Sequence, residues 1–472
     1  MTMSLCSLAE GAVVEQLTLL PKDLSMKPGR ASRSTLSSSA PVDIALQVTT
    51  LLPMTSESLD FERPVAAIVG PRVDLLSLDE AGLSALALRL GDKAFRGKQL
   101  FAWLHGKRIN DIAAMTDLST SLRQKLSEQG ELRRPVVEDV RVAADGTRKY
   151  QLLTFDNHTI EAVWIPHASG PGRHALCISS QVGCAMGCNF CATASLKLTR
   201  HLTPGEIVGQ VYAVMADLAA NLPDDPPLPS SKMKFRYDPE PDETVGDTLD
   251  FDDDVGMERG PRKQPRRVQN IVYMGMGEPL HNVDNVIQSI KLLTNEKAIG
   301  YSPRRLTVST SGVVSALPRL AEETGVHLAV SLNATTNDVR KDIMPVTKRW
   351  DIDALLDACR AFPADRRRRI TFEYVLLADI NDTDDDARRL GKLLKGMKSK
   401  VNLIPFNPHP LAPYGRPADE RVDAFRAILD KNNVENFVRT TRGLDIDAAC
   451  GMLGAKKLEA ARANSSLTIL QS

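Results

Sequence analysis

The chain of 472 residues lacks any run of about 18 apolar residues, the length that a membrane-spanning helix requires, so we expect no membrane partner. It also lacks net charge, because 59 Lys and Arg residues balance 59 Asp and Glu residues. At face value this balance argues against a strongly basic nucleic-acid-binding protein. Hydrophobic residues make up 43% of the chain, which excludes collagen-like and fully disordered classes. The length indicates a globular protein of about two to three domains.

A secretory signal is missing as well, since the first 20 residues contain no basic start followed by an apolar core. Residues 1–72 mix Ser, Pro and Thr with short apolar pieces, and we expect a disordered or loosely ordered extension there. The alternative is a transit peptide, because the Ser-rich residues 28–50 contain Arg30 and Arg33. Acidic residues in the same region weigh against that alternative. We therefore expect a cytoplasmic protein.

The cysteine content does not suit a disulfide-stapled secreted domain. There are seven cysteines, an odd number, in a long chain. Three of them, Cys184, Cys188 and Cys191, lie within eight residues of one another. Clustered thiols in a reducing compartment indicate metal ligation or redox chemistry.

The hydrophobic pattern of the first part of the chain is helical. From Ser77 to Glu80 the sequence has the form of a capping box, which predicts a helix to about Leu90, and two further apolar stripes follow. Residues 73–135 are therefore expected to form a helical accessory domain. Over residues 136–172 the period changes to two, which predicts a linker segment of antiparallel β-hairpins.

Residues 173–460 have the alternating strand and helix pattern of a parallel sheet. Each predicted strand is short and apolar, and polar or Gly-rich residues and then a helical segment follow it. The predicted strands are Ala175–Ser179, Asn270–Met274, Arg305–Ser309, His327–Leu332, Ile370–Leu376 and Val401–Pro405. Six such units are fewer than a closed eight-fold barrel needs, so the fold class is α/β with a partial (β/α)6 barrel.

An acidic insertion interrupts this core. Residues 221–258 contain 12 acidic and three basic residues, and we expect a disordered loop over 221–268. The net charge of −9 there leaves +9 on the remainder, so the neutral total hides a basic body. A single group of neighbouring Lys and Arg residues is more often a solvent-exposed surface than an RNA contact. Taken together, the clusters allow a phosphate-binding surface.

The spacing C-x3-C-x2-C of Cys184, Cys188 and Cys191 directly follows the first predicted barrel strand, at the edge where parallel barrels place their chemistry. A structural zinc ion normally has four ligands. A four-iron four-sulfur (4Fe-4S) cluster held by three thiolates leaves one iron without a protein ligand. That iron can bind a small molecule through an amine and a carboxylate group. A zinc site with a distant fourth ligand and unligated buried cysteines are the alternatives.

This motif resembles that of the radical S-adenosylmethionine (SAM) superfamily. Four further strings narrow the resemblance to the RlmN/Cfr family of RNA methyltransferases; they occupy residues 177–184, 275–280, 309–312 and 445–451. The resemblance covers about residues 75–455 apart from the insertion. It implies a radical SAM barrel and methylation at C2 of adenine in 23S rRNA, and in tRNA next to the anticodon. A Cfr-type enzyme acting on C8 is the alternative, and a non-catalytic iron–sulfur RNA-binding protein is less favoured.

The resemblance also implies the site residues. Cys184, Cys188 and Cys191 would hold one 4Fe-4S cluster. The residues that it assigns to SAM are Gly277, Glu278, Ser309, Ser331, Leu332, Asn333 and Asn407. Some family members carry His at the position of Asn333, where a backbone contact is the alternative.

The mechanism implied by the family uses two SAM molecules per turnover and a pair of cysteines. The first SAM methylates Cys450, and a radical from the second takes a hydrogen from that methyl group. The carbon radical then adds to C2 of the adenine. Cys177 would release the product by forming a disulfide with Cys450, and Glu161 matches the acid/base carboxylate. The implied partners are 23S rRNA, tRNA and an electron donor such as flavodoxin, and we expect a monomer.

Overall fold

The computed structural model describes residues 72–166, 174–222, 268–363 and 369–454. The predicted extension up to residue 71 and residues 223–267 of the predicted acidic insertion lie outside the described residues. Among the helices described, none is both long and apolar enough to cross a bilayer.

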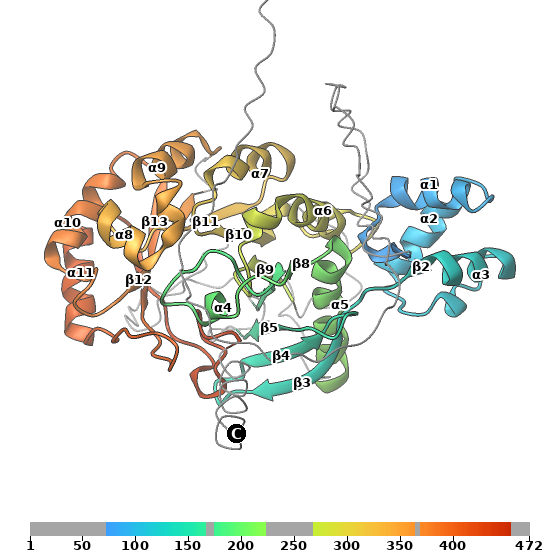
Figure 1. The fold of residues 1–472 in the computed structure, drawn as a ribbon, viewed down its shortest axis with the longest axis horizontal. Coiled ribbons are helices and arrows are strands. Elements are labelled where there is room, and N and C mark those ends of the chain that lie inside the picture. Colours follow the sequence, from blue (N-terminus) through green and yellow to red (C-terminus); the bar gives the residue numbers. More distant parts are fainter. Residues whose placement is uncertain (1–71, 167–173, 223–267, 364–368, 455–472) are drawn as a thin grey trace, which may run out of the picture. The chain divides into compact units, whose positions relative to one another are not determined.

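The first described segment is mainly helical (Figure 1). Its elements are β1 (Val73–Asp74), η1 (Leu75–Ser77), α1 (Glu80–Arg89), α2 (Arg96–Phe101), η2 (Ala102–Gly106), η3 (Ile112–Ala114), α3 (Thr120–Gln129) and β2 (Gly130–Glu131). The start of α1 differs from the prediction, because Asp79 caps the helix by accepting the N–H of Gly82 at 2.8 Å. The hydroxyl oxygen of Ser77 instead accepts the N–H of Gly205 at 2.9 Å, and its hydrogen is donated to Asp74 at 2.6 Å.

The main sheet has ten strands in the order β14-β13-β12-β11-β10-β9-β6-β5-β4-β3. These strands are β3 (Val136–Val142), β4 (Arg148–Leu153), β5 (Thr159–Ile165), β6 (Ala175–Cys177), β9 (Asn270–Tyr273), β10 (Leu306–Thr310), β11 (His327–Ser331), β12 (Ile370–Leu376), β13 (Ser399–Pro405) and β14 (Asn436–Val438). The strands from β6 to β14 pair in parallel, and β3, β4 and β5 extend the sheet in antiparallel fashion.

This architecture confirms the predicted partial barrel. The sequence pattern missed β14, which is three residues long and pairs with β13. The hairpin strands pair with β6 within the main sheet. The hairpins and the barrel thus share one sheet, and the domain boundaries expected at residues 135/136 and 172/173 stay predictions.

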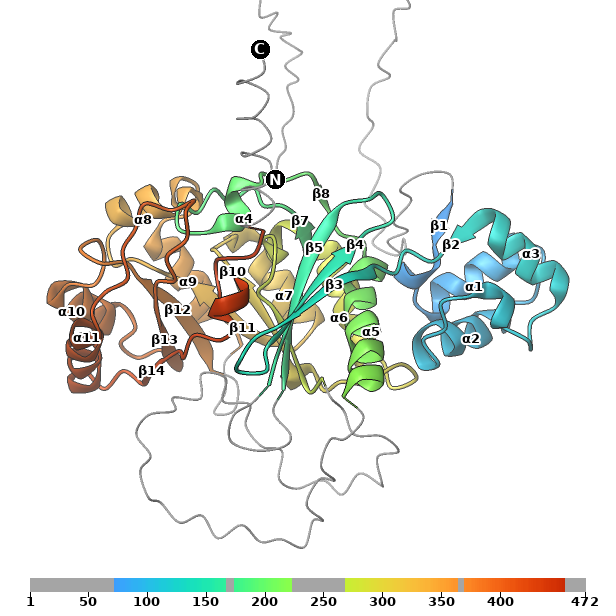
Figure 2. The same ribbon diagram turned by 90° about the horizontal axis from the view of Figure 1, so that it is seen from below.

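Helices run along the outside of the curved sheet (Figures 1 and 2). The helices of the core are α4 (Ala192–Ser195), α5 (Pro204–Asn221), α6 (Val283–Thr294), α7 (Leu317–Glu323), α8 (Asn337–Ile343), α9 (Ile352–Ala361), α10 (Asp384–Leu393) and α11 (Asp419–Lys431). Shorter elements are η4 (Pro279–Asn282), η5 (Pro303–Arg305), η6 (Val314–Ala316), η7 (Pro345–Lys348), η8 (Leu444–Ile446) and the two-residue strands β7 (Gln181–Val182) and β8 (Arg200–His201).

Alternation along β12 shows how the sheet separates core from site. Tyr374 packs against Phe425 of α11 with ring centroids 5.5 Å apart, so this face is turned to the helices. Glu373 and Val375 have the opposite orientation and line a pocket inside the barrel. Inward-facing side chains from successive strands therefore share one interior space.

Candidate active site

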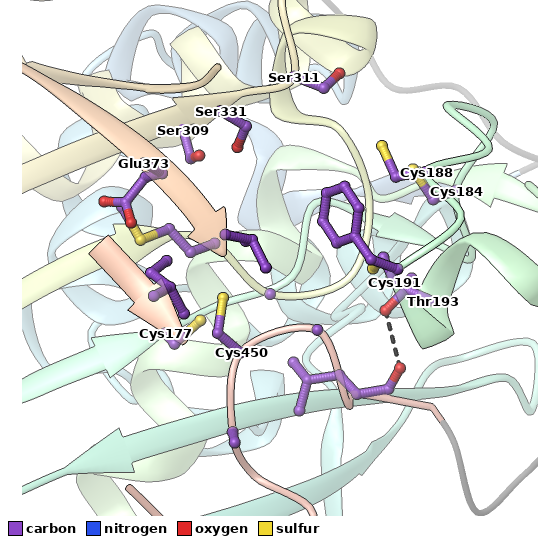
Figure 3. A pocket seen from close by; sticks show the side chains of 18 of the residues that line it. Cys177, Cys184, Cys188, Cys191, Thr193, Ser309, Ser311, Ser331, Glu373 and Cys450 are labelled. Atoms are coloured by element: carbon purple, nitrogen blue, oxygen red, sulfur yellow. Dashed lines mark hydrogen bonds between the residues drawn. The ribbon is translucent and has the colours of Figure 1, made fainter. Parts of the chain in front are cut away.

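The carboxyl ends of the parallel strands surround one pocket, which Figure 3 shows from close by. The sequence-predicted residues that line it are Cys177, Cys184, Cys188, Cys191, Gly277, Glu278, Ser309, Ser331, Asn333, Asn407 and Cys450. Two predicted residues, Glu161 and Leu332, do not line it. With its other lining residues included, the pocket brings together side chains from seven strands, β5, β6 and β9 to β13, and from the last described loop.

The loop that carries Cys184, Cys188 and Cys191 is tightly folded between β7 and α4. Gly183 has a φ of +77°, and a Cβ there would lie 1.6 Å from the carbonyl oxygen of Lys197. Only glycine fits this position. The three thiols are free of disulfides. Burial is the main cause that raises the pKa of all three, to about 12 for Cys184.

This donor set fits a cluster that brings its own positive charge. Three half-buried thiols close together resist ionisation, and a bound metal compensates the thiolate charges. In the part of the chain that the structure describes, no three His, Cys, Asp or Glu side chains are gathered closely enough to hold a single metal ion. Thiolates that bind different irons of a 4Fe-4S cluster are spread more widely than the ligands of one zinc ion, so the arrangement is compatible with a cluster.

Glu278 lies at the end of the turn that follows β9 and is buried. Its Oε1 accepts the N–H of Leu280 at 2.9 Å, and its Oε2 accepts the N–H of Ser311 at 2.7 Å. Burial raises the pKa of the carboxyl, and these backbone donors oppose the shift. The result is a fixed carboxylate at the pocket wall, suited to pairing with an ammonium group.

Gln181 fixes the neighbouring glycine turn, and the sequence analysis assigned it no role. Its Oε1 accepts the N–H of Glu278 at 2.8 Å. Gly277 has a φ of +101°, and a Cβ there would lie 2.5 Å from the Cβ of Gln181. Gln181 lies within the string 177–184, which could have indicated a role. Its contact is with Glu278, however, which is far away in the sequence.

Arg340 is a second residue that the sequence analysis missed. Its guanidinium is fully buried and donates to the carbonyl oxygens of Leu332 at 2.9 Å, Ser311 at 2.8 Å and Ser331 at 3.0 Å. Burial lowers its pKa to about 10. Arg340 therefore fixes the ends of β10 and β11, and Leu332 contributes a carbonyl to this framework while its side chain is buried.

The two predicted asparagines fix neighbouring backbone. Asn333 has a φ of +56°, a conformation that Asn tolerates better than most residues, and its Oδ1 accepts the N–H of Val375 at 2.7 Å. Asn407 donates through Nδ2 to the carbonyl oxygen of Cys450 at 3.4 Å and accepts from Thr441 at 3.0 Å. Asn407 thus links the end of β13 to the Cys450 loop.

Cys177 and Cys450 meet in the same pocket, and their sulfur atoms point toward one another in Figure 3. Both are free thiols. Burial, with a smaller effect of Cys450, raises the pKa of Cys177 to about 12. Cys450 is reachable from solvent through the pocket, but surrounding protein raises the pKa of its thiol, and the nearby Arg439 lowers it.

The loop of Cys450 is hydrogen-bonded to the three-cysteine loop. Gly451 accepts the N–H of Ala192 at 2.8 Å. The hydroxyl of Thr193 donates to the carbonyl oxygen of Leu453 at 2.9 Å, drawn as a dashed line in Figure 3. These bonds hold Cys450 beside the three-cysteine loop.

Glu161 lies on β5, on the same face as Val163 and Ile165, which do line the pocket. Its carboxylate is buried, pairs with Lys149 at 3.2 Å and accepts the N–H of Gly454 at 2.9 Å. The structure therefore places the predicted acid/base carboxylate against the end of the Cys450 loop rather than at the pocket wall.

The comparisons with known proteins agree with this geometry. A family model described as the ribosomal RNA large subunit methyltransferase N-terminal domain matches residues 73–132. A crystal structure of a radical SAM methyltransferase from Sphaerobacter thermophilus is similar to the chain with a TM-score of 0.67 and 37% identity, covering 81% of this chain and 99% of that one. The fold and the site therefore define the class of radical SAM methyltransferases.

Two curated relatives identify the family within this class. A dual-specificity RNA methyltransferase RlmN from Novosphingobium aromaticivorans is 44% identical over 406 residues, which is 83% of this chain and 89% of the relative. Another RlmN, from Erythrobacter litoralis, is 42% identical over 424 residues, covering 88% of this chain and 95% of the relative. The chain belongs to the RlmN family of dual-specificity RNA methyltransferases. Membership implies SAM and a 4Fe-4S cluster as cofactors.

Proposed function

We propose that the protein methylates C2 of adenine in 23S rRNA and in tRNA, with an S-methylcysteine at Cys450 as the intermediate. The observation that carries this proposal is the placement of Cys177 and Cys450 in the pocket that the three-cysteine loop also lines. An enzyme that moved a methyl group directly from SAM to its target would need neither thiol. A thiol within reach of a second thiol suits covalent capture followed by exchange.

Cys184, Cys188 and Cys191 would hold the cluster, and Gly277 with Glu278 would receive the amino group of SAM. When bound and reduced, the cluster supplies the electron that SAM cleavage requires. The fixed carboxylate of Glu278 supports its assignment, because both oxygens are already oriented by backbone donors.

Cys450 accepts a methyl group from a first SAM molecule in this proposal, and a second SAM molecule is used to activate that methyl group. Once the methyl-derived carbon is bonded to C2 of the adenine, Cys177 attacks the sulfur of Cys450 and forms a disulfide. The bond from that sulfur to the carbon breaks, and the carbon keeps the electron pair and takes up a proton to become the methyl group of the product. Arg439 lies near both cysteines and favours the thiolate form that each step uses.

Glu161 acts as the acid/base group toward the RNA base. Its position on β5, two residues from the pocket-lining Val163, supports this role. The Glu161 carboxylate is held by Lys149 and by the N–H of Gly454, so its orientation depends on the segment that follows Cys450.

Analysis of methylated nucleosides tests the proposal. The anaerobically reconstituted protein would be incubated with SAM, a reductant such as reduced flavodoxin, and unmodified rRNA fragment or tRNA, and the digested RNA examined by mass spectrometry. We expect 2-methyladenosine from both RNAs. Formation of 8-methyladenosine would contradict the C2 position, and SAM cleavage without any methylated adenosine would contradict the RNA substrate.

A further inference from the structure

An acidic side chain that the proposed mechanism does not use faces the pocket interior. Glu373 lies in the middle of β12 and its side chain is only 5% exposed. Its Oε2 accepts from Nδ2 of Asn402 at 2.9 Å. Its Oε1 is buried and has no hydrogen-bond partner within residues 72–454 as the structure describes them. A buried polar atom without a partner is costly, so this oxygen indicates a missing donor.

The position of Glu373 restricts what that donor is. Glu373 is directly opposite Ser331 in the register of β11 and β12. In Figure 3, Glu373 lies on the same side of the pocket as Ser309 and Ser331, and Cys184 and Cys188 lie on the other side. The unpaired oxygen is therefore at the end of the pocket away from the three-cysteine loop.

The charges around Glu373 are compatible with an ionised carboxylate that accepts a hydrogen bond from an uncharged donor. Burial raises its pKa, and the positive charges of Arg439 and Lys400 oppose that shift. No salt bridge to Glu373 is found among the described side chains, and its one hydrogen bond is to the amide of Asn402. The negative charge thus has positive neighbours, while Oε1 remains available.

We propose that Glu373 is a further SAM-binding residue whose free Oε1 accepts a hydrogen bond from a ribose hydroxyl of SAM. This inference rests on the proposed function, since it uses SAM bound through its amino group at Glu278. With the amino acid end at Glu278 and the three-cysteine loop, the nucleoside extends to the opposite end of the pocket. There its vicinal hydroxyls are paired donors, and carboxylates commonly accept from ribose hydroxyls in nucleotide sites.

The test compares ribose and deoxyribose ligands in the reconstituted holoprotein. Binding of S-adenosylhomocysteine and of its 2′-deoxy and 3′-deoxy analogues would be measured by calorimetry. Wild type is expected to lose about 10- to 100-fold in affinity for one of the deoxy analogues, since hydrogen bonds to charged groups are worth about 1.5–3 kcal/mol. In Glu373→Ala the preference for that hydroxyl is expected to disappear, and in Glu373→Gln it is expected to be reduced.

Thr371→Val is the matched control. Thr371 is a buried residue on the same face of β12, two residues before Glu373, and it does not line the pocket. We expect this variant to keep the full preference for the ribose hydroxyl. Iron content and circular dichroism of each variant establish that the cluster and the fold are retained.

Three results would overturn the inference. The first is an undiminished preference in Glu373→Ala, or a wild type that does not distinguish the deoxy analogues. The second is weaker RNA binding with unchanged ligand preference, which would assign the donor to the target nucleotide. The third, a failure of wild-type holoprotein to bind any of the ligands, would contradict the SAM site of the proposed function itself.

Discussion

The backbone N–H of Gly454 donates a 2.9 Å hydrogen bond to Oε2 of Glu161. This bond joins β5 to the loop that carries Cys450, although the two residues are far apart in the sequence. The other carboxylate oxygen of Glu161 pairs with Lys149 at 3.2 Å, and Lys149 also donates to the carbonyl oxygen of Asp447 at 3.0 Å. Tertiary structure therefore places Glu161, the proposed acid/base residue, against the loop of the proposed methyl carrier Cys450.

Glu161→Gln is expected to separate the two halves of the reaction. An amide oxygen still accepts the N–H of Gly454, but the side chain loses the charge that proton transfer needs. We expect RNA methylation to fall by about 100-fold or more, while methylation of Cys450 by SAM is kept. Nucleoside analysis and peptide mass spectrometry measure the two activities, and equal losses in both would contradict an acid/base role.

Arg439 is predicted to control the reactivity of Cys450. Arg439→Met removes the positive charge that lowers the Cys450 pKa, so that pKa rises further and less thiolate is present at a given pH. Alkylation of Cys450 by iodoacetamide should therefore shift to higher pH. Arg360→Met is the control, because Arg360 lies on α9 and pairs with Asp357 at 2.6 Å. An unchanged pH profile in Arg439→Met would contradict the role.

The same profiles distinguish the two cysteines in the wild type. Burial raises the pKa of Cys177 to about 12, so its thiolate fraction stays small until the pH approaches that value. Burial also raises the pKa of Cys450, and the positive charge of Arg439 is the largest effect that lowers it. We expect peptide mapping to find Cys450 alkylated at lower pH than Cys177. The reverse order would contradict the assignment of Cys450 as the methyl acceptor.

Gly277→Ala is predicted to impair SAM binding. Its φ of +101° is unfavourable for alanine, and the new Cβ would lie 2.5 Å from the Cβ of Gln181, which fixes the Glu278 turn. Gly396→Ala is the matched control, since Gly396 also has a positive φ, of +81°, but nothing lies within 4 Å of an added Cβ. Calorimetry should detect weaker S-adenosylhomocysteine binding only in Gly277→Ala, and equal effects in both variants would attribute the loss to backbone strain alone.

The cluster assignment predicts a clear difference among the cysteines. Cys184→Ala, Cys188→Ala or Cys191→Ala should each lower the iron and sulfide content after anaerobic reconstitution. Cys359→Ala is the control, because Cys359 is buried on α9 and does not line the pocket. Full iron content in any of the three variants would contradict the assignment of that residue.

The sequence predicted the barrel because its strands are apolar runs followed by glycine or polar residues, as in the predicted strand Asn270–Met274, which Gly275 follows. It did not predict β14, since Asn436–Val438 is too short to carry a pattern.

The residues that fix the site were harder to predict. Gln181 and Arg340 act through backbone groups of distant segments, which no local pattern identifies. Glu373 did carry a signal, because a carboxylate inside a buried strand requires a partner or a function. The prediction that Ser77 caps α1 was wrong because Ser77 and Asp79 both suit the motif, and only the contact of Ser77 with the distant Gly205 distinguishes them.

Trapping the covalent intermediate would test whether Cys450 carries the methyl group to the RNA. Reconstituted Cys177→Ala would be incubated with SAM, reductant and tRNA, and the products separated under denaturing conditions and mapped by mass spectrometry. We expect an RNA–protein adduct joined through the methyl-derived carbon at Cys450, and no such adduct in Cys177→Ala/Cys450→Ala. Free methylated RNA formed by Cys450→Ala, or an adduct at any other residue, would contradict it.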